Sequence, residues 1–268
     1  MFRRALLILS VMLALSFSIS VVRPAVVDVQ TGDVIDAGTI GPGQTVSLQI
    51  DPIVNTGGIH GQGGQYDYAI VEGLPPGWTA TNSKLYQNPL QITITADPDA
   101  MPANYSAKVI VVDEFNGEKL GNISFDVFIE ITYDVMEFEV TPEKIETGLD
   151  QPARFAIIIK NTGSTSDVFE VSATGSKRWD FKKPVFVPGH SSRMIPYEIA
   201  GNETEEYYAT ISVVSLASDK IHDEKNVTLV IKSTLLGDYK ATNNGVVLFP
   251  IFQMPIYSLA GLLANLFG

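Results

Sequence analysis

Apolar and polar residues alternate with a period of two along most of the chain between residues 26 and 233. Such alternation predicts strands with one buried face, and Gly, Pro, Asn or Asp at the ends of each run predicts turns. No stretch of this region has a convincing helical period, so we expect an all-β protein built from sandwiches. The clearest predicted strands are residues 45–53, 66–71, 90–95, 105–112, 123–133, 138–140, 154–160, 168–173, 194–199, 207–214 and 227–232.

Near residue 135 the alternation changes phase within one continuous stretch of the chain. Apolar residues occupy odd positions from Phe125 to Val135 and even positions at Met136, Phe138 and Val140. A shift of one residue turns every side chain to the opposite face of a strand, so one strand cannot serve a single core across this point. We therefore expect two tandem β-sandwich domains, over residues 26–134 and 136–233, joined by a short linker.

Several short motifs recur in both halves. The second half contains Ile157-Ile158-Ile159-Lys160-Asn161-Thr162-Gly163, then Asp167, Trp179 and Val187-Pro188-Gly189, and the first half contains Gly41-Pro42-Gly43 and Leu74-Pro75-Pro76-Gly77-Trp78. These motifs resemble archaeal and bacterial surface modules of the cell-adhesion-related and alpha-galactosidase-associated types. The resemblance implies two immunoglobulin-like sandwiches that serve as non-catalytic spacers, adhesion units or accessory domains.

The first 22 residues are typical of an export signal. Arg3 and Arg4 precede an apolar stretch that weakens into small residues, and the pattern predicts cleavage after Ser20. The alternative is an uncleaved signal-anchor helix, because residues 5–22 are just long enough to span a bilayer. Either way we expect the rest of the chain to be delivered outside the cytoplasm, to the cell envelope.

Residues 246–268 form an apolar segment without any charged residue. Pro255 suits the first turn of a short helix over residues 256–267, with Ser258, Gly261 and Asn265 along one face. Small residues let membrane helices approach each other closely, so these three are candidate contacts with a partner in the membrane. A membrane anchor, an interfacial or partner-docked helix, and a helix folded onto the sandwiches remain alternatives.

Composition excludes several classes of function. The formal net charge of −12 argues against nucleic-acid binding, which requires a basic face. The chain has no cysteine, which excludes disulfides, thiolate metal sites and cysteine nucleophiles. We expect the sandwiches to be stabilised by core packing.

Catalytic and metal-binding motifs are weak or absent in the sequence. The three histidines, His60, His190 and His222, have no zinc-binding spacing, and no serine-nucleophile motif occurs. We therefore expect no enzymatic activity and no cofactor. Calcium is an alternative, on the hypothesis that loop carboxylates gather at one end of the first sandwich; these are Asp97, Asp99, Asp113, Glu114 and Glu118.

Two kinds of surface site are expected. The glycine-rich residues 57–65 are either a mobile loop or a contact loop, in which His60 and Gln62 would bind a protein partner. Four sequons make Asn104, Asn122, Asn202 and Asn226 candidate glycosylation sites at strand starts and loops.

The sequence as a whole favours an exported, membrane-tethered interaction or structural protein of the cell envelope. In that role it would be an accessory subunit of a membrane or surface complex. The alternative is a carbohydrate-binding module, for which Tyr66, Tyr68, Trp78 and Tyr86 are the candidate aromatic residues. Of these four, Trp78 is the one expected to lie in the core.

Overall fold

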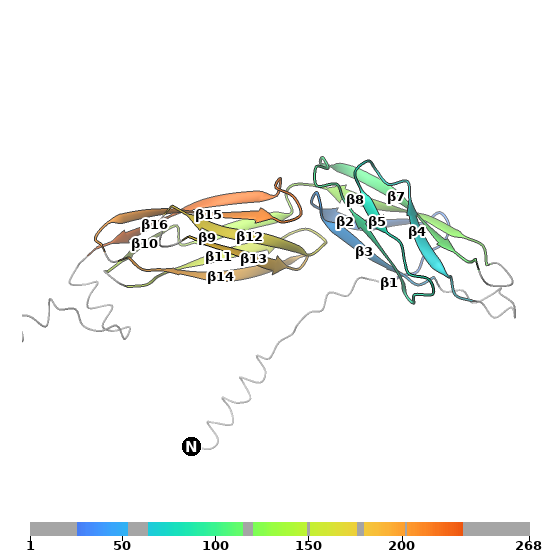
Figure 1. Ribbon diagram of the computed structural model, residues 1–268, viewed down its shortest axis with the longest axis horizontal. Helices are drawn as coiled ribbons and strands as arrows, with labels where there is room; N and C mark the ends of the chain where they lie inside the picture. Colours follow the sequence, from blue (N-terminus) through green and yellow to red (C-terminus); the bar gives the residue numbers. More distant parts are fainter. Residues whose placement is uncertain are drawn as a thin grey trace, which may run out of the picture.

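The computed structural model describes residues 26–52, 64–114, 120–148, 151–175, 180–201 and 203–232, and these residues are all-β. Two sandwiches lie end to end (Figure 1). We call them the first domain (β1 to β8) and the second domain (β9 to β16). The strands are β1 (Val26–Val27), β2 (Val34–Ile40), β3 (Thr45–Ile50), β4 (Tyr68–Glu72), β5 (Thr79–Thr81), β6 (Leu90–Thr95), β7 (Ala103–Val112), β8 (Ile123–Ile131), β9 (Met136–Thr141), β10 (Lys144–Thr147), β11 (Ala153–Asn161), β12 (Asp167–Thr174), β13 (Phe181–Val187), β14 (Ser191–Ile199), β15 (Glu206–Ser215) and β16 (His222–Ile231).

The strand order of the first domain is that of an immunoglobulin-like sandwich. One sheet has the order β1-β3-β6-β5 and the other has the order β2-β8-β7-β4. In immunoglobulin lettering these are strands A-B-E-D and A′-G-F-C, which is the constant-type arrangement with an added A′ strand. Strand β2 pairs in parallel with β8, and its register shifts between Asp36 and Thr39.

The second domain repeats this order with one strand moved. Its sheets have the orders β9-β11-β14 and β10-β16-β15-β12-β13, or A-B-E and A′-G-F-C-C′. The difference lies in the strand that follows strand C. In the first domain this strand, β5, pairs with strand E (β6). In the second domain it is β13, which pairs with strand C itself (β12). Both domains are immunoglobulin-like sandwiches that differ at one edge.

Alternating side chains build a separate core in each domain. The first core extends from Val29 to Ile131 and the second from Val135 to Ile231. In β11, Phe155, Ile157 and Ile159 are buried while the residues between them are more exposed, as a half-buried strand requires.

Trp78 is buried in the first core against Tyr105, with ring centroids 5.0 Å apart. The Tyr105 hydroxyl donates a hydrogen bond to the carbonyl oxygen of Met101 at 3.0 Å. Tyr105 lies near the start of strand F, so this bond is the tyrosine corner that recurs in immunoglobulin-like domains. It fixes the connection between β6 and β7.

Several sheet edges are blocked against pairing with another chain. Edge strands β13 and β14 each contain a proline, Pro184 and Pro196, which cannot donate a ladder hydrogen bond. The free edge of β4 is covered by residues 82 and 83: the amide of Val71 donates to Asn82 Oδ1, and Ser83 bonds both the amide and the carbonyl oxygen of Ala69. Blocked edges disfavour aggregation through strand addition.

The predicted terminal helices, over residues 1–22 and 246–268, lie outside the described residues. Within the described part of the chain, no helix has the length and apolarity needed to cross a membrane.

Candidate functional site

A turn of the second domain is the centre of the contact between the two domains, which we call the junction. The turn spans residues 161–165, and the buried Asn161 side chain holds it through hydrogen bonds to Gly163, Thr165 and Val187. From this turn, the Ser164 amide donates to the Thr39 carbonyl oxygen at 2.8 Å, and Ser164 Oγ accepts from the Thr39 amide at 3.0 Å. These bonds attach the end of β2 to the second domain.

Buried polar side chains continue the junction. Gln44, 3% exposed, donates from Nε2 to Oδ2 of Asp167, 6% exposed, at 2.8 Å. The same carboxylate oxygen accepts from Ser215 Oγ at 2.7 Å, and Gln44 Oε1 accepts from Thr165 Oγ1 and the Gly41 amide. Buried polar groups with all partners in place rigidify the elements that they connect.

Close backbone approach at the junction requires glycine in the first domain. Gly43 has φ +70°, and a Cβ built there would lie 2.7 Å from the carbonyl carbon of Ala217. On Gly38, at φ +84°, a Cβ would lie 2.9 Å from Cβ of Ser164. A side chain at either position would therefore both strain the backbone and push the domains apart.

A second contact lies beside this network. Ser218 Oγ donates to the Pro98 carbonyl oxygen at 2.8 Å, and Lys220 Nζ lies 2.9 Å from Asp99 Oδ1. The hydrogen bond to Asp99 raises the pKa of the Lys220 ammonium. The junction therefore joins the domains at two places.

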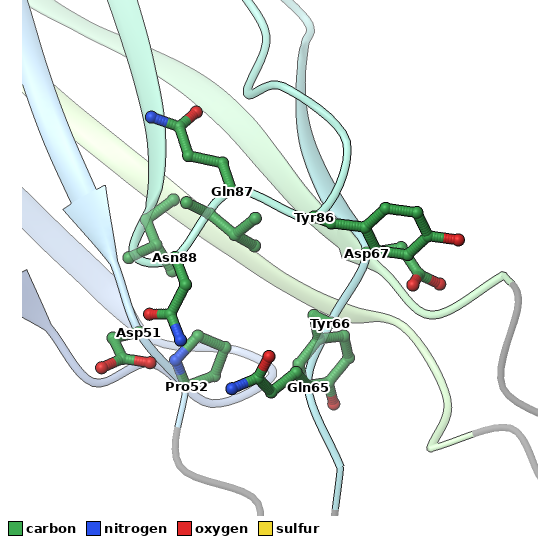
Figure 2. Close-up of a pocket in the computed structure, with 10 residues that line it drawn as sticks. Asp51, Pro52, Gln65, Tyr66, Asp67, Tyr86, Gln87 and Asn88 are labelled. Carbon is green, nitrogen blue, oxygen red and sulfur yellow. The ribbon is translucent and has the colours of Figure 1, made fainter.

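At the opposite end of the first domain is a pocket of about 290 Å³, which we call the distal pocket. Three segments form it: the end of β3, the segment leading into β4, and the segment before β6 (Figure 2). Figure 2 shows the amides of Asn88 and Gln65 near Asp51 and Pro52, and the ring of Tyr86 beside Asp67, directed away from them. The lining residues are Ile50, Asp51, Pro52, Gln65, Tyr66, Asp67, Tyr86, Gln87, Asn88 and Leu90.

Buried carboxylates fix the segments around the distal pocket. Asp67 Oδ2 accepts from the Glu114 amide at 2.6 Å, and the Asp113 carboxylate accepts from the Leu120 amide. The Asp67 carbonyl oxygen accepts from the Tyr86 amide at 2.7 Å. The bonds that Asp67 accepts from Glu114 and Tyr86 thus hold together segments that are distant in the sequence.

Tyr86 has an unusual backbone conformation, with φ +57°. A bulky residue in this left-handed region is uncommon and strained. Tyr86 is 63% exposed, so burial in the core does not hold it in this conformation. Strained residues of this kind cluster at binding sites.

The electrostatic surroundings of the distal pocket are acidic. Burial, with the Asp113 carboxylate as a smaller cause, raises the pKa of the Tyr66 hydroxyl. Desolvation and a hydrogen bond to Glu114 raise the pKa of the nearby Tyr68 hydroxyl. Both tyrosines stay neutral hydrogen-bonding groups at ordinary pH, and no lysine or arginine is among the lining residues.

The structure brings together two of the four aromatic residues considered for carbohydrate binding. Tyr66 and Tyr86 line the distal pocket, and Tyr68 lies next to it on β4. Trp78 is in the core, as the sequence predicts.

The predicted gathering of loop carboxylates is wrong. Asp97 and Asp99 lie at the junction, whereas Asp113 and Glu114 follow the far end of β7, next to the distal pocket. The whole length of β7 separates the two pairs, and Glu118 lies outside the described residues. In the described part of the chain, no group of three or more His, Asp or Glu side chains is placed to hold a metal ion.

The other predicted site residues are scattered. His190, with φ +50°, lies in the turn before β14, and His222 begins β16 with Nδ1 2.7 Å from the Asp219 carbonyl oxygen. The contact candidates His60, Gln62, Ser258, Gly261 and Asn265 lie outside the described residues, as do Trp179 and the sequon at Asn202.

The three described sequons are all exposed. Asn104 is near the start of β7 and Asn122 precedes β8. The prediction that Asn226 lies at the start of a strand is wrong, because β16 begins at His222. Residues 222–226 are polar and lack apolar alternation, but they pair with β15 and so extend the strand. Asn226 Oδ1 accepts a hydrogen bond from Thr210 Oγ1 at 2.8 Å.

Sequence reasoning missed that Gln44, Asp167 and Ser215 meet at the junction and that Asp51 and Asn88 line the distal pocket. Asp167 stands in a motif that the sequence singles out, and Gln44 directly follows the Gly41-Pro42-Gly43 motif, but neither residue was predicted to contact the other domain. The only signal in the sequence for such contact residues was a polar residue immediately before or after an apolar run.

Comparisons with known proteins give only distant structural similarity. No protein-family model matches the chain, and no curated protein matches its sequence. Among solved structures, the CARDB domain of a Pyrococcus furiosus protein, crystallised with di-metal ions, is 16% identical and matches with a TM-score of 0.28, covering 36% of this chain and 94% of its own.

Two further structures are similar at the same level. A chimeric titin Z1Z2 carrying a decorin peptide is 8% identical with a TM-score of 0.34, covering 77% of this chain and 95% of its own. The ASH/PapD-like domain of human CEP192 is 11% identical with a TM-score of 0.27, covering 36% of this chain and 84% of its own. These similarities are too low to assign a family, and the immunoglobulin-like fold follows from the strand order described above.

Proposed function

We propose that this chain is an exported, membrane-tethered and non-catalytic interaction protein of the cell envelope, serving as an accessory subunit of a membrane or surface complex. Within that role its sandwiches are surface modules of the cell-adhesion-related or alpha-galactosidase-associated type. The observation that carries the proposal is the junction, in which buried side chains of both domains share hydrogen bonds. Such a junction makes two sandwiches one rigid spacer rather than two independently moving modules.

The direction of the strands gives this spacer two functional ends. β16 runs away from the junction, so the chain leaves the second domain at Lys232, at the end opposite the first domain. The distal pocket is at the other end of the first domain. Because a ten-residue strand spans roughly 33 Å, the two ends are separated by roughly 65 Å.

Residues 246–268 are the proposed tether. A tether there would place the second domain next to the membrane and present the distal pocket away from it. The small residues Ser258, Gly261 and Asn265 would then contact a partner within the membrane. An uncleaved signal anchor at residues 1–22 would instead hold the first domain at the membrane. Val26 pairs with Gln49 near the end of β3, so the chain enters the first domain at the end that carries the distal pocket.

Membrane fractionation of the full chain and of a variant lacking residues 246–268 tests the proposal. The full chain should remain with membranes after an alkaline wash, should be accessible to protease only from outside, and should lose the signal sequence by mass spectrometry. The shortened chain should be released. A full chain found in the cytosol, or washed off as readily as the shortened one, contradicts the proposal.

A matched pair of variants separates the tether from the partner. Gly261→Leu keeps the segment apolar but enlarges the small-residue face, so it should stay in the membrane and lose the co-purifying partner in detergent. Leu263→Ile, on the apolar face, should retain both. Equal partner recovery with the two variants would contradict a partner contact through Gly261.

A further inference from the structure

The distal pocket combines an apolar floor with hydrogen-bonding walls. Ile50, Pro52 and Leu90 supply apolar surface, while the amide side chains of Gln65 and Asn88 line the walls. An apolar concavity with a few converging polar groups is the usual form of a small-molecule site. Its volume of about 290 Å³ is at the lower end for such sites, so it fits a small ligand or one unit of a larger one.

The lining chemistry narrows the class of ligand. Amide side chains both donate and accept hydrogen bonds, and the carboxylate of Asp51 accepts only, which together suit groups that are donors and acceptors at once. Hydroxyl groups have this property. A phosphate, sulfate or carboxylate ligand would meet Asp51 and Asp67 without any lysine or arginine in the lining, and is therefore disfavoured.

Tyr86 adds an aromatic ring to the pocket. Its exposed ring lies beside Asp67 at the outer edge of the pocket, on the side away from Asn88 and Asp51 (Figure 2). The backbone there is strained, and the Tyr86 amide donates a hydrogen bond to the Asp67 carbonyl oxygen. A rigidly placed aromatic ring offers an apolar face to a ligand at low entropic cost. A sugar has an apolar ring with hydroxyl groups around it, which matches a pocket that has an aromatic residue at one edge and amides and a carboxylate at the other.

We infer that the distal pocket binds a neutral saccharide unit, so that the end of the spacer presented away from the membrane contacts glycans. This inference deepens the proposed function, since it names what the exposed end of the interaction protein recognises. The saccharide hydroxyls bond to Gln65, Asn88 and Asp51, and Tyr86 borders the sugar ring.

Saturation-transfer NMR on the full chain tests the inference. The chain is produced in a host that does not glycosylate asparagine and is purified in a polyoxyethylene detergent, because glucoside and maltoside detergents would compete. The probes are the methyl glycosides of glucose, galactose, mannose and N-acetylglucosamine. At least one should show saturable binding.

Three variants locate the binding. Tyr86→Gly removes the ring and relieves the positive φ, so the fold should be retained while affinity falls about tenfold. Gln65→Ala should weaken binding by a similar factor. Leu85→Ala, an exposed neighbour outside the lining, should leave affinity unchanged.

Several results would overturn the inference that the distal pocket binds a saccharide. Absence of binding to all four glycosides overturns the inference, as does binding that is equal in wild type and Tyr86→Gly. Methyl glucuronide serves as an acidic probe, and lysine methylamide acetylated on its α-amino group serves as a basic probe. Preference for either probe over every neutral sugar also overturns the inference. None of these results depends on membrane fractionation, so the inference can fail while the proposed function stands.

Discussion

Replacing Gly43 by alanine should open the junction without disturbing either core. The new Cβ would lie 2.7 Å from the carbonyl carbon of Ala217, against an ordinary contact distance of about 3.7 Å, and closer still to the carbonyl oxygen. Relieving these contacts requires the domains to separate by at least about 1 Å. Gly73→Ala is the matched control, because Gly73 has nearly the same φ, +65° against +70°, but nothing within 4 Å of its Cβ position.

The expected loss can be worked out from the hydrogen bonds of the junction. A separation of about 1 Å stretches bonds of 2.8 to 3.0 Å beyond the distance of about 3.6 Å at which a contact no longer counts as a hydrogen bond. At least three bonds are affected, two between Thr39 and Ser164 and one between Gln44 and Asp167. The bonds from Thr165 to Gln44 and from Ser218 to the Pro98 carbonyl oxygen cross the junction as well. At about 1 kcal/mol each, the loss of the first three alone lowers the coupling between domains by about 3 kcal/mol.

Amide hydrogen exchange measures this coupling directly. The amides of Thr39 and Ser164 should exchange about a hundredfold faster in Gly43→Ala than in wild type, since 1.4 kcal/mol corresponds to a factor of ten. Both alanine variants should lose a similar 1–2 kcal/mol of overall stability from the left-handed backbone. Equal exchange of the two amides in Gly43→Ala and Gly73→Ala would refute the reasoning.

Three further predictions concern single side chains. Asp167→Ala should destabilise the protein by about 3 kcal/mol in urea, because it leaves two buried donors without an acceptor; a loss below about 1 kcal/mol would show that the network contributes little. Tyr105→Phe should cost about 1 kcal/mol by removing the hydroxyl bond of the tyrosine corner, and no measurable loss would count against that bond. Burial, with the Asp180 carboxylate as a smaller cause, raises the pKa of Tyr197 to about 12. The neutral Tyr197 hydroxyl therefore contributes fully to the stability of the folded state below pH 10, and this contribution is lost as pH rises through 12. Tyr197→Phe should flatten this part of the curve of stability against pH. An unchanged curve would contradict the raised pKa of Tyr197.

The sequence predicts the strands at the centre of the sheets much better than those at their edges. The five strands without a predicted counterpart are β1, β2, β5, β10 and β13, and each lies at the edge of its sheet. Edge strands here are short, as β5 is, or carry charges and proline, as β13 does, so their apolar alternation is weak. These same features protect an edge from pairing, which explains why periodicity cannot find it.

The functional features are harder to predict because they join distant parts of the chain. Gln44 and Asp167 are 123 residues apart, and the segments around the distal pocket meet only once the sandwich has closed. The sequence marks each segment as a turn but does not say which turns share an end of the domain. For the same reason the acidic loops predicted to gather lie at opposite ends of β7.

The central claim is that the two sandwiches form one rigid unit, and a spin-label distance between the domains tests it most directly. The chain has no cysteine, so Ser106→Cys on β7 and Ser192→Cys on β14, both exposed, can be labelled without background. The buried junction predicts one narrow distance population that broadens when Gly43→Ala is added. A broad or two-peaked distribution in the otherwise unaltered chain would contradict the claim.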